Sequence, residues 1–154
     1  MFQKNLIVMP EQVFQKKEEV LDYLTHLEND RVTDPEGYAR DVREREASFT
    51  TYIFEGIATP HAKSSCVKTP FVVYAKLAEK VHWGDDEGED ADLVFLLGVP
   101  KVSGDNEFAN LHLKVLAVLS KKLVHEDFRN SLRAASNTDE VYELLKKIEE
   151  EIKK

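Results

Sequence analysis

The sequence is poor in cysteine and in basic residues, and it lacks a long hydrophobic run. Its single cysteine, Cys66, excludes an internal disulfide bond and a cysteine-based zinc site within one chain, which is typical of a reducing compartment. Only 21 Lys and Arg residues stand against 29 Asp and Glu residues, and the resulting net charge of −8 repels nucleic-acid phosphates and anionic lipid surfaces. We therefore expect neither nucleic-acid binding nor direct membrane binding.

The apolar run nearest the N-terminus, residues 6–9, is far shorter than a signal-peptide core or the ~20 residues of a membrane span. This shortness predicts a cytoplasmic protein. The chain has 154 residues, of which 42% are hydrophobic and 32% charged, so it can bury one core. We expect a single domain over residues 1–154.

Helical and extended patterns alternate along the chain. Apolar residues at helical spacing predict helices over residues 13–29, 34–46, 107–123, 128–134 and 137–152. Asp34 and Asn137 stand at N-cap positions, before Pro35 and three residues before Glu140 respectively. Short apolar runs predict strands over residues 6–9, 71–75 and 93–99, and residues 49–70 read as loop and strand. This interleaving favours a layered α/β fold.

Three sequence features that could form a metal site or a hydrolase site do not have the required residue pattern. The acidic residues between 85 and 92 lack the order of a calcium-binding loop, so a solvated loop is favoured. The five histidines show no pair at the i, i+4 spacing of a helical metal site, and we expect His26 and His125 to be exposed. Ser64, Ser65 and Cys66 follow His61 too closely to form a hydrolase triad, and the chain has no nucleophile elbow or Gly-rich phosphate loop.

Two histidines remain as candidates for chemistry. His112 falls on the apolar face of the helix at 107–123, where a histidine is either a hydrogen-bonded core residue or a catalytic group. His61 follows the segment 56–60, in which Pro60 fixes the backbone just before the imidazole. The small residues Gly56 and Ala58 let another protein or a phosphoryl group approach. This rigid apolar platform suits an exposed reactive group.

The segment 56–62, together with Glu46 and Ile53, resembles the active-site histidine motif of the fructose/mannitol-type enzyme IIA domain of the bacterial phosphoenolpyruvate-dependent sugar phosphotransferase system. Residues 43–46 precede the motif at the interval seen in that family, and residues 106–123 are similar to its second histidine helix. Similarity in residues 83–95 and 141–145 extends the resemblance over nearly the whole chain. Thr59 stands where the family usually has an aliphatic residue, and Phe54 where it usually has a small one.

The resemblance implies a mixed β-sheet flanked by helices on both faces and a phosphotransferase that uses no metal and no other cofactor. It implies that His61 accepts a phosphoryl group from the phosphocarrier HPr, while His112 and Arg45 bind the phosphoryl oxygens. It further implies that the group passes to a cysteine of an enzyme IIB on another chain, and so indirectly serves a membrane enzyme IIC. A guanidinium offers a fixed fork of donors, and a second imidazole donates without a large like-charge penalty, which agrees with these roles.

Two alternatives stay open at this stage. The first is a regulatory enzyme IIA-like protein of the nitrogen-linked branch, which acts through phosphorylation-dependent protein binding and feeds no transporter. The second is an interaction domain without chemistry. A reactive His61 would exclude the interaction domain without chemistry. Neighbouring genes for a IIB and a IIC would distinguish a transport protein from the regulatory one.

Overall fold

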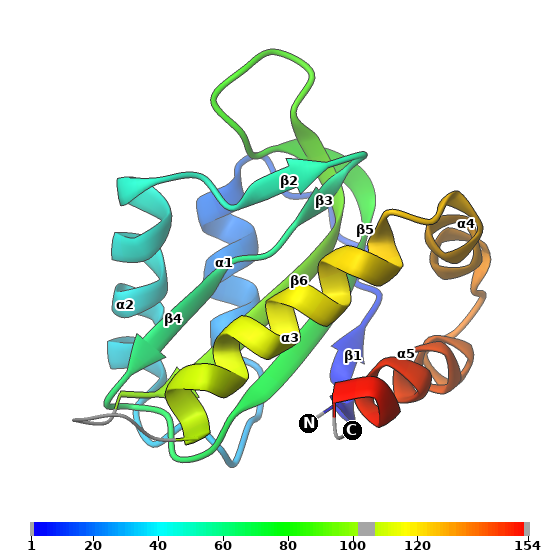
Figure 1. Cartoon of the computed structure of the whole chain (residues 1–154). Helices are drawn as coiled ribbons and strands as arrows, with labels where there is room; N and C mark the ends of the chain where they lie inside the picture. Colours follow the sequence, from blue (N-terminus) through cyan, green and yellow to red (C-terminus); the bar gives the residue numbers. More distant parts are fainter. Residues whose placement is uncertain (1, 102–106, 153–154) are drawn as a thin grey trace.

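A six-stranded mixed sheet forms the centre of the fold in the computed structural model (Figure 1), which describes the backbone of residues 2–101 and 107–152 and the side chains of residues 2–101 and 114–151. The strand order is β1 (Phe2–Val8), β5 (Phe71–His82), β6 (Asp90–Pro100), β3 (Ile57–Ala58) and β2 (Tyr52–Phe54), and β4 (His61–Ser64) also pairs with β6. The β1·β5, β3·β6 and β4·β6 pairs are parallel, whereas β5·β6 and β2·β3 are antiparallel.

Helices cover both faces of the sheet. One face carries α1 (Lys17–Thr25) and α2 (Pro35–Ser48), and the other carries α3 (Glu107–Leu123), α4 (Glu126–Ala134) and α5 (Thr138–Ile152) (Figure 1). Alternate residues of the central strands feed two separate cores: Val94 and Leu96 pack on the α1 and α2 side, and Leu93 and Phe95 on the other. The predicted α/β class, with a mixed sheet flanked on both faces, is confirmed.

The structure corrects some predicted boundaries. Helix α1 is shorter than the predicted helix over 13–29, and Val13 lies before it with 49% of its surface exposed. Strand β5 continues to His82 and β6 begins at Asp90, so the acidic loop is limited to residues 83–89 and Asp92 belongs to a strand. The second half of β5 is largely exposed and contains no continuous apolar run, so the sequence pattern did not predict it as strand.

The two predicted helix caps differ in detail. Asn137 Oδ1 accepts the Glu140 N–H at 2.9 Å, and Glu140 Oε2 accepts the Ser136 N–H at 2.7 Å, which confirms the cap of α5. Asp34 occupies the N-cap of α2 as predicted, but its side chain makes no capping hydrogen bond. The proline directly after it, with its φ already helical, helps this helix to begin.

The turn between β2 and β3 is fixed by an ion pair from α4. Glu55 and Gly56 both have positive φ, at 49° and 80°. Arg133 donates to both carboxylate oxygens of Asp92, at 2.8 and 3.1 Å, and to the Glu55 carbonyl at 2.7 Å. A Cβ at position 56 would lie 2.7 Å from Arg133 Nη2 and from Asp92 Oδ1. The turn therefore needs glycine both for its backbone conformation and for this close approach.

A pair of glycine substitutions separates these two requirements. Gly88 has φ 86°, and nothing lies within 4 Å of the place a Cβ would take. Gly88→Ala is expected to lower the free energy of unfolding by about 1–2 kcal/mol through backbone strain alone. Gly56→Ala should lower it clearly further, because it also displaces the Arg133–Asp92 pair. Urea unfolding of both variants measures the difference, and equal losses would show that the ion pair does not constrain this turn.

Candidate functional site

His61 is placed by the pairing of its strand with β6. Ile57 pairs with Leu93, Ala58 with Val94 and His61 with Leu97, so β3 and β4 follow β6 in one continuous register. Ala58 and Ala62 pack into the core under α1 and α2. Because neighbouring residues of a strand point to opposite faces, His61 lies on the other face, along which α3 runs in Figure 1.

The imidazole of His61 is held in one tautomer. Its Nδ1 lies 2.9 Å from the Thr59 carbonyl oxygen, which can only accept, so Nδ1 carries the proton. The lone pair of the neutral ring is therefore on Nε2. Burial lowers the pKa of His61 below its ordinary value; the Thr59 hydrogen bond raises it in part, and the positive charge of Arg45 lowers it further. The net direction keeps the ring neutral at pH 7.

Arg45 lies in the last turn of α2, close enough to His61 for its charge to affect the imidazole. Its Nη1 donates to the Phe49 carbonyl at 2.7 Å. A guanidinium has five N–H donors, and this bond orients the others. Lys63, two residues beyond His61, adds a second positive charge that acts in the same direction on the His61 pKa.

The side chain of His112 lies outside the described residues. The backbone of α3 is described, and it places position 112 one turn before Val115, which packs in the core with Leu119. The predicted role of His112 stays a prediction.

The predicted platform residues are closely packed. Ala58 is fully buried, and Pro60 is buried between β3 and β4, with its carbonyl accepting the Leu97 N–H at 2.9 Å. Gly56 contacts the Arg133–Asp92 pair at the far end of β3. Pro60 thus lies directly against the strand that positions His61, whereas Gly56 shapes the turn that precedes it.

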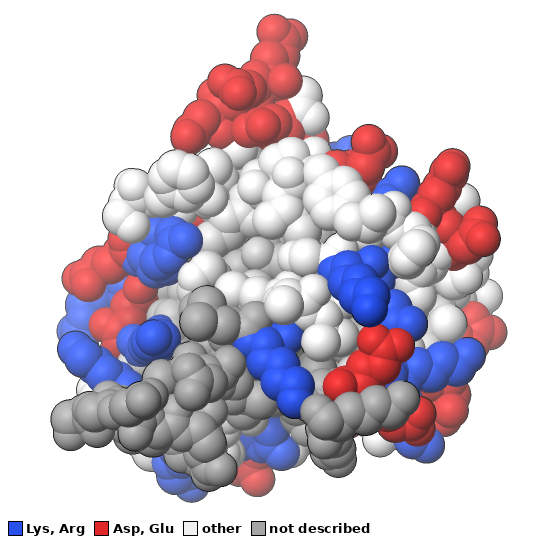
Figure 2. Space-filling model, in the orientation of Figure 1, with Lys and Arg blue, Asp and Glu red and all other residues white. Residues whose placement is uncertain are grey.

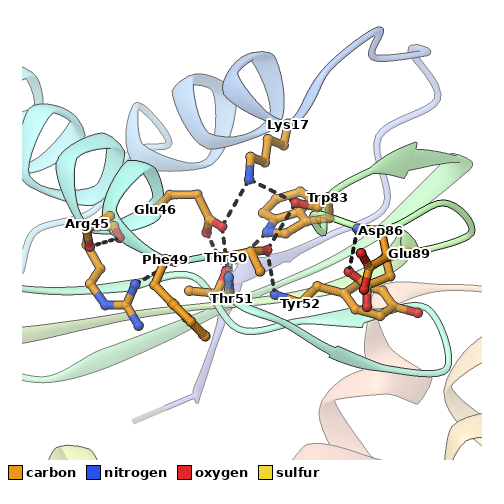
Figure 3. A network of polar contacts seen from close by, with 11 residues as sticks. Lys17, Arg45, Glu46, Phe49, Thr50, Thr51, Tyr52, Trp83, Asp86 and Glu89 are labelled. Carbon is orange, nitrogen blue, oxygen red and sulfur yellow. Dashed lines mark hydrogen bonds and ion pairs between the residues drawn. The ribbon is translucent and has the colours of Figure 1, made fainter.

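A buried carboxylate lies beside Arg45: the sequence places Glu46 in the resembled motif but predicts no role for it. Glu46 is 5% exposed and lies among Lys17, Thr51 and Trp83 (Figure 3). Figure 3 also shows Arg45 and Glu46 leaving the end of α2 in different directions. The partners of Glu46 are Lys17, at the start of α1, and Thr51, directly before β2; both also bind Trp83, just after β5. No local sequence pattern brings these residues together.

The residues that the sequence did not assign to a functional site have structural roles or are exposed. His26 and His125 are exposed, as expected, although His26 also contacts Glu36 at 2.5 Å and so links the end of α1 to α2. Ser64 is fully buried and donates to Asp41 at 2.6 Å.

Over the described residues, no group of three or more His, Cys, Asp or Glu side chains is placed to hold a metal ion. Within that same part of the chain, no helix is long and apolar enough to cross a membrane.

Comparison with known proteins identifies the family of this chain. Residues 1–148 match the family model described as "Phosphoenolpyruvate-dependent sugar phosphotransferase system, EIIA 2". The chain is 35% identical over 119 residues to a fructose-like EIIA component of the phosphotransferase system from Escherichia coli, covering 77% of this chain and 76% of the relative.

Two solved structures share the fold. The nitrogen regulatory protein IIA-Ntr from Neisseria meningitidis superposes with a TM-score of 0.82 at 23% identity, over 94% of this chain and 95% of that protein. A complex of enzyme IIA and phosphorylated enzyme IIB of the Escherichia coli mannitol system matches with a TM-score of 0.75 at 27% identity, over 94% of this chain and 98% of that one.

The fold and the matched residues define an EIIA component of the fructose/mannitol type. The chain belongs to the EIIA 2 family of the phosphoenolpyruvate-dependent sugar phosphotransferase system.

The electrostatic contact between Arg45 and His61 is directly testable. Arg45→Gln removes a positive charge that lowers the pKa of His61, so this pKa should rise. The change is measured by NMR titration of the His61 ring. Arg43→Gln is the matched control, because Arg43 lies in the same helix, is exposed and contacts Asp22. An unchanged pKa in Arg45→Gln, or an equal rise in the control, would contradict the contact.

Proposed function

We propose that this protein carries a phosphoryl group on His61, accepting it from phospho-HPr and passing it to a cysteine of a separate enzyme IIB that serves a membrane enzyme IIC. The observation that carries the proposal is the state of the His61 ring. Its Nδ1 proton is bound to Thr59, and burial lowers its pKa, so the neutral ring has its lone pair on Nε2. A histidine must be neutral to attack phosphorus.

Each transfer step needs only the protein that donates the phosphoryl group and the protein that accepts it. The Nε2 lone pair forms a bond to phosphorus, and the bond between phosphorus and HPr breaks with its electron pair returning to HPr. The Nδ1–H bond to Thr59 remains and supports the positive charge that the phosphorylated ring acquires. A cysteine thiolate of IIB then forms the next bond to phosphorus, and the Nε2–P bond breaks.

Charge develops on the phosphoryl oxygens during both steps, so the protein contributes by positioning and electrostatic stabilisation. Arg45 and Lys63 are cations near His61. We assign the Arg45 guanidinium, which offers a fixed fork of donors, to these oxygens together with His112 from α3. The solved complex of a mannitol IIA with phosphorylated IIB supports an IIB as the acceptor.

The regulatory alternative has weaker support. The similarity to the nitrogen regulatory protein is one of fold, at 23% identity. The sequence relative at 35% identity is named as a fructose-like component. The transport function is therefore favoured, and an adjacent gene for an enzyme IIB would support it independently.

The first test is the site of phosphorylation. Incubation with phosphoenolpyruvate, enzyme I and HPr should label His61 alone, on Nε2, as mapped by mass spectrometry under alkaline conditions and by NMR of the ring. The rate of labelling should be constant above pH 7 and fall as the pH drops through the lowered pKa, because the attacking ring becomes protonated. Labelling of Cys66 or of another histidine would refute the proposal, and an unlabelled protein would favour an interaction domain.

The second test concerns His112. If it binds the phosphoryl oxygens, His112→Gln should keep stability nearly intact, because the amide still donates one hydrogen bond. Onward transfer to IIB should fall by about 10²–10³-fold, the usual effect of one such donor. Acceptance from HPr should persist. A lower melting temperature with normal onward transfer would instead assign His112 to the core.

A further inference from the structure

We propose that Glu46 is a positioning residue for His61: it holds Thr51, which holds Thr59, whose carbonyl fixes the tautomer and orientation of the imidazole. This inference rests on the proposed phosphoryl transfer for its consequence, but its geometry stands independently of that function. Thr51 directly precedes β2 and Thr59 directly follows β3, so the contacts run along the end of this strand pair and join the end of α2 to β4.

The carboxylate of Glu46 is almost completely enclosed. Its side chain is 3% exposed, and its Oε2 accepts the Lys17 ammonium at 3.2 Å and the Thr51 backbone N–H at 2.8 Å. Its Oε1 accepts the Thr51 hydroxyl. Thr51 Oγ1 in turn accepts the indole N–H of Trp83 at 3.1 Å, and Lys17 also donates to the Trp83 carbonyl at 2.8 Å (Figure 3). Glu46 thus binds both the backbone and the side chain of Thr51.

Two further hydrogen bonds connect Thr51 to His61. The Thr51 carbonyl accepts the Thr59 N–H at 3.0 Å, and the Thr59 carbonyl accepts His61 Nδ1–H at 2.9 Å. Thr59 therefore uses its N–H to hold its own position and its carbonyl to hold the imidazole. A displacement of Thr51 moves the acceptor that determines which ring nitrogen carries the proton.

Stability alone does not explain a charged pair at this position. Replacing a buried ion pair by apolar residues of similar size is often neutral or stabilising, because the charges must lose their hydration. An apolar residue at position 46 would nevertheless leave the Thr51 N–H and hydroxyl without their acceptor. The carboxylate is the group that can receive both donors and the Lys17 ammonium at once.

The consequence for transfer follows from the tautomer. With the proton on Nδ1, Nε2 carries the lone pair that can attack phosphorus; with the proton on Nε2, attack at that atom is impossible. Loss of the Glu46 contacts should therefore populate the second tautomer and reduce the fraction of reactive rings. Because HPr docking does not depend on the proton's location, KM for phospho-HPr should change little.

The experiment compares three variants of the full chain. Lys17→Met/Glu46→Leu replaces the pair by apolar side chains and removes the acceptor for Thr51. Glu46→Gln keeps an oxygen for the Thr51 N–H but loses the charge. Thr25→Val is the matched control, because Thr25 is 3% exposed and its hydroxyl donates to the Leu21 carbonyl in α1, away from these contacts. The readouts are the His61 tautomer, from ring nitrogen NMR shifts, and single-turnover transfer from phospho-HPr.

The double variant should show the Nε2–H tautomer and a maximal transfer rate lowered by up to about 100-fold, as expected for a displaced reacting group. Glu46→Gln should keep the wild-type tautomer, and Thr25→Val should keep both tautomer and rate. If the double variant does not fold, Thr51→Val, which removes only the hydroxyl contacts, should shift the tautomer partially in the same direction.

A folded double variant with the wild-type tautomer would overturn the inference, as would an equal tautomer shift in Thr25→Val. If the double variant is unfolded, an unchanged tautomer in Thr51→Val would also overturn the inference. Failure of the proposed function is distinguishable, because it appears as an unlabelled His61 in the wild-type protein, whereas the tautomer is measured without any phosphoryl donor.

Discussion

The pairing of β6 is the constraint on which the rest of the structure depends. This strand pairs antiparallel with β5 on one edge and parallel with β3 and β4 on the other, and its residues 93–100 are all buried. Alternate side chains serve the two cores, so a shift by one residue would exchange them. The same pairing sets His61 opposite Leu97. The position of His61 is thereby tied to the best-buried strand of the sheet.

What the sequence could predict depended on whether a signal was local. The apolar run at 93–99 and the helical spacing of α5 are local, and both elements were found. Strands β2, β3 and β4 have two to four residues each, and their pairing partners rather than their own composition define them. The roles of His61 and Arg45 were predicted through a family resemblance, and the structure places the two close enough to interact electrostatically. The contacts around Glu46 were missed because Lys17, which binds it, and Trp83, which binds Lys17, are far from it in the chain.

Charge is distributed unevenly over this acidic protein. Figure 2 shows acidic side chains gathered on the protrusion at the top of the view, over the β5–β6 loop, where Asp85, Asp86 and Glu87 are exposed. Beside His61, by contrast, the cations Arg45 and Lys63 lower the pKa of the ring, whereas the Thr59 hydrogen bond and the enclosed Glu46 carboxylate raise it. The net charge of −8 thus does not describe the local environment of His61. That environment combines burial with nearby positive charge, both of which favour a neutral imidazole.

The two departures from the family motif, Phe54 and Thr59, have physical explanations in the structure. The ring of Phe54 packs against the core under α3, α4 and α5, and the Arg129 guanidinium lies 5.6 Å from its centre, so α4 provides the space for a large side chain. Thr59 acts through its backbone: its N–H binds Thr51 and its carbonyl binds His61. An aliphatic residue at position 59 could make the same two bonds. At position 59, the placement of the backbone N–H and carbonyl therefore matters more than the side chain. The pairing of the neighbouring strands with β2 and β6 sets this placement.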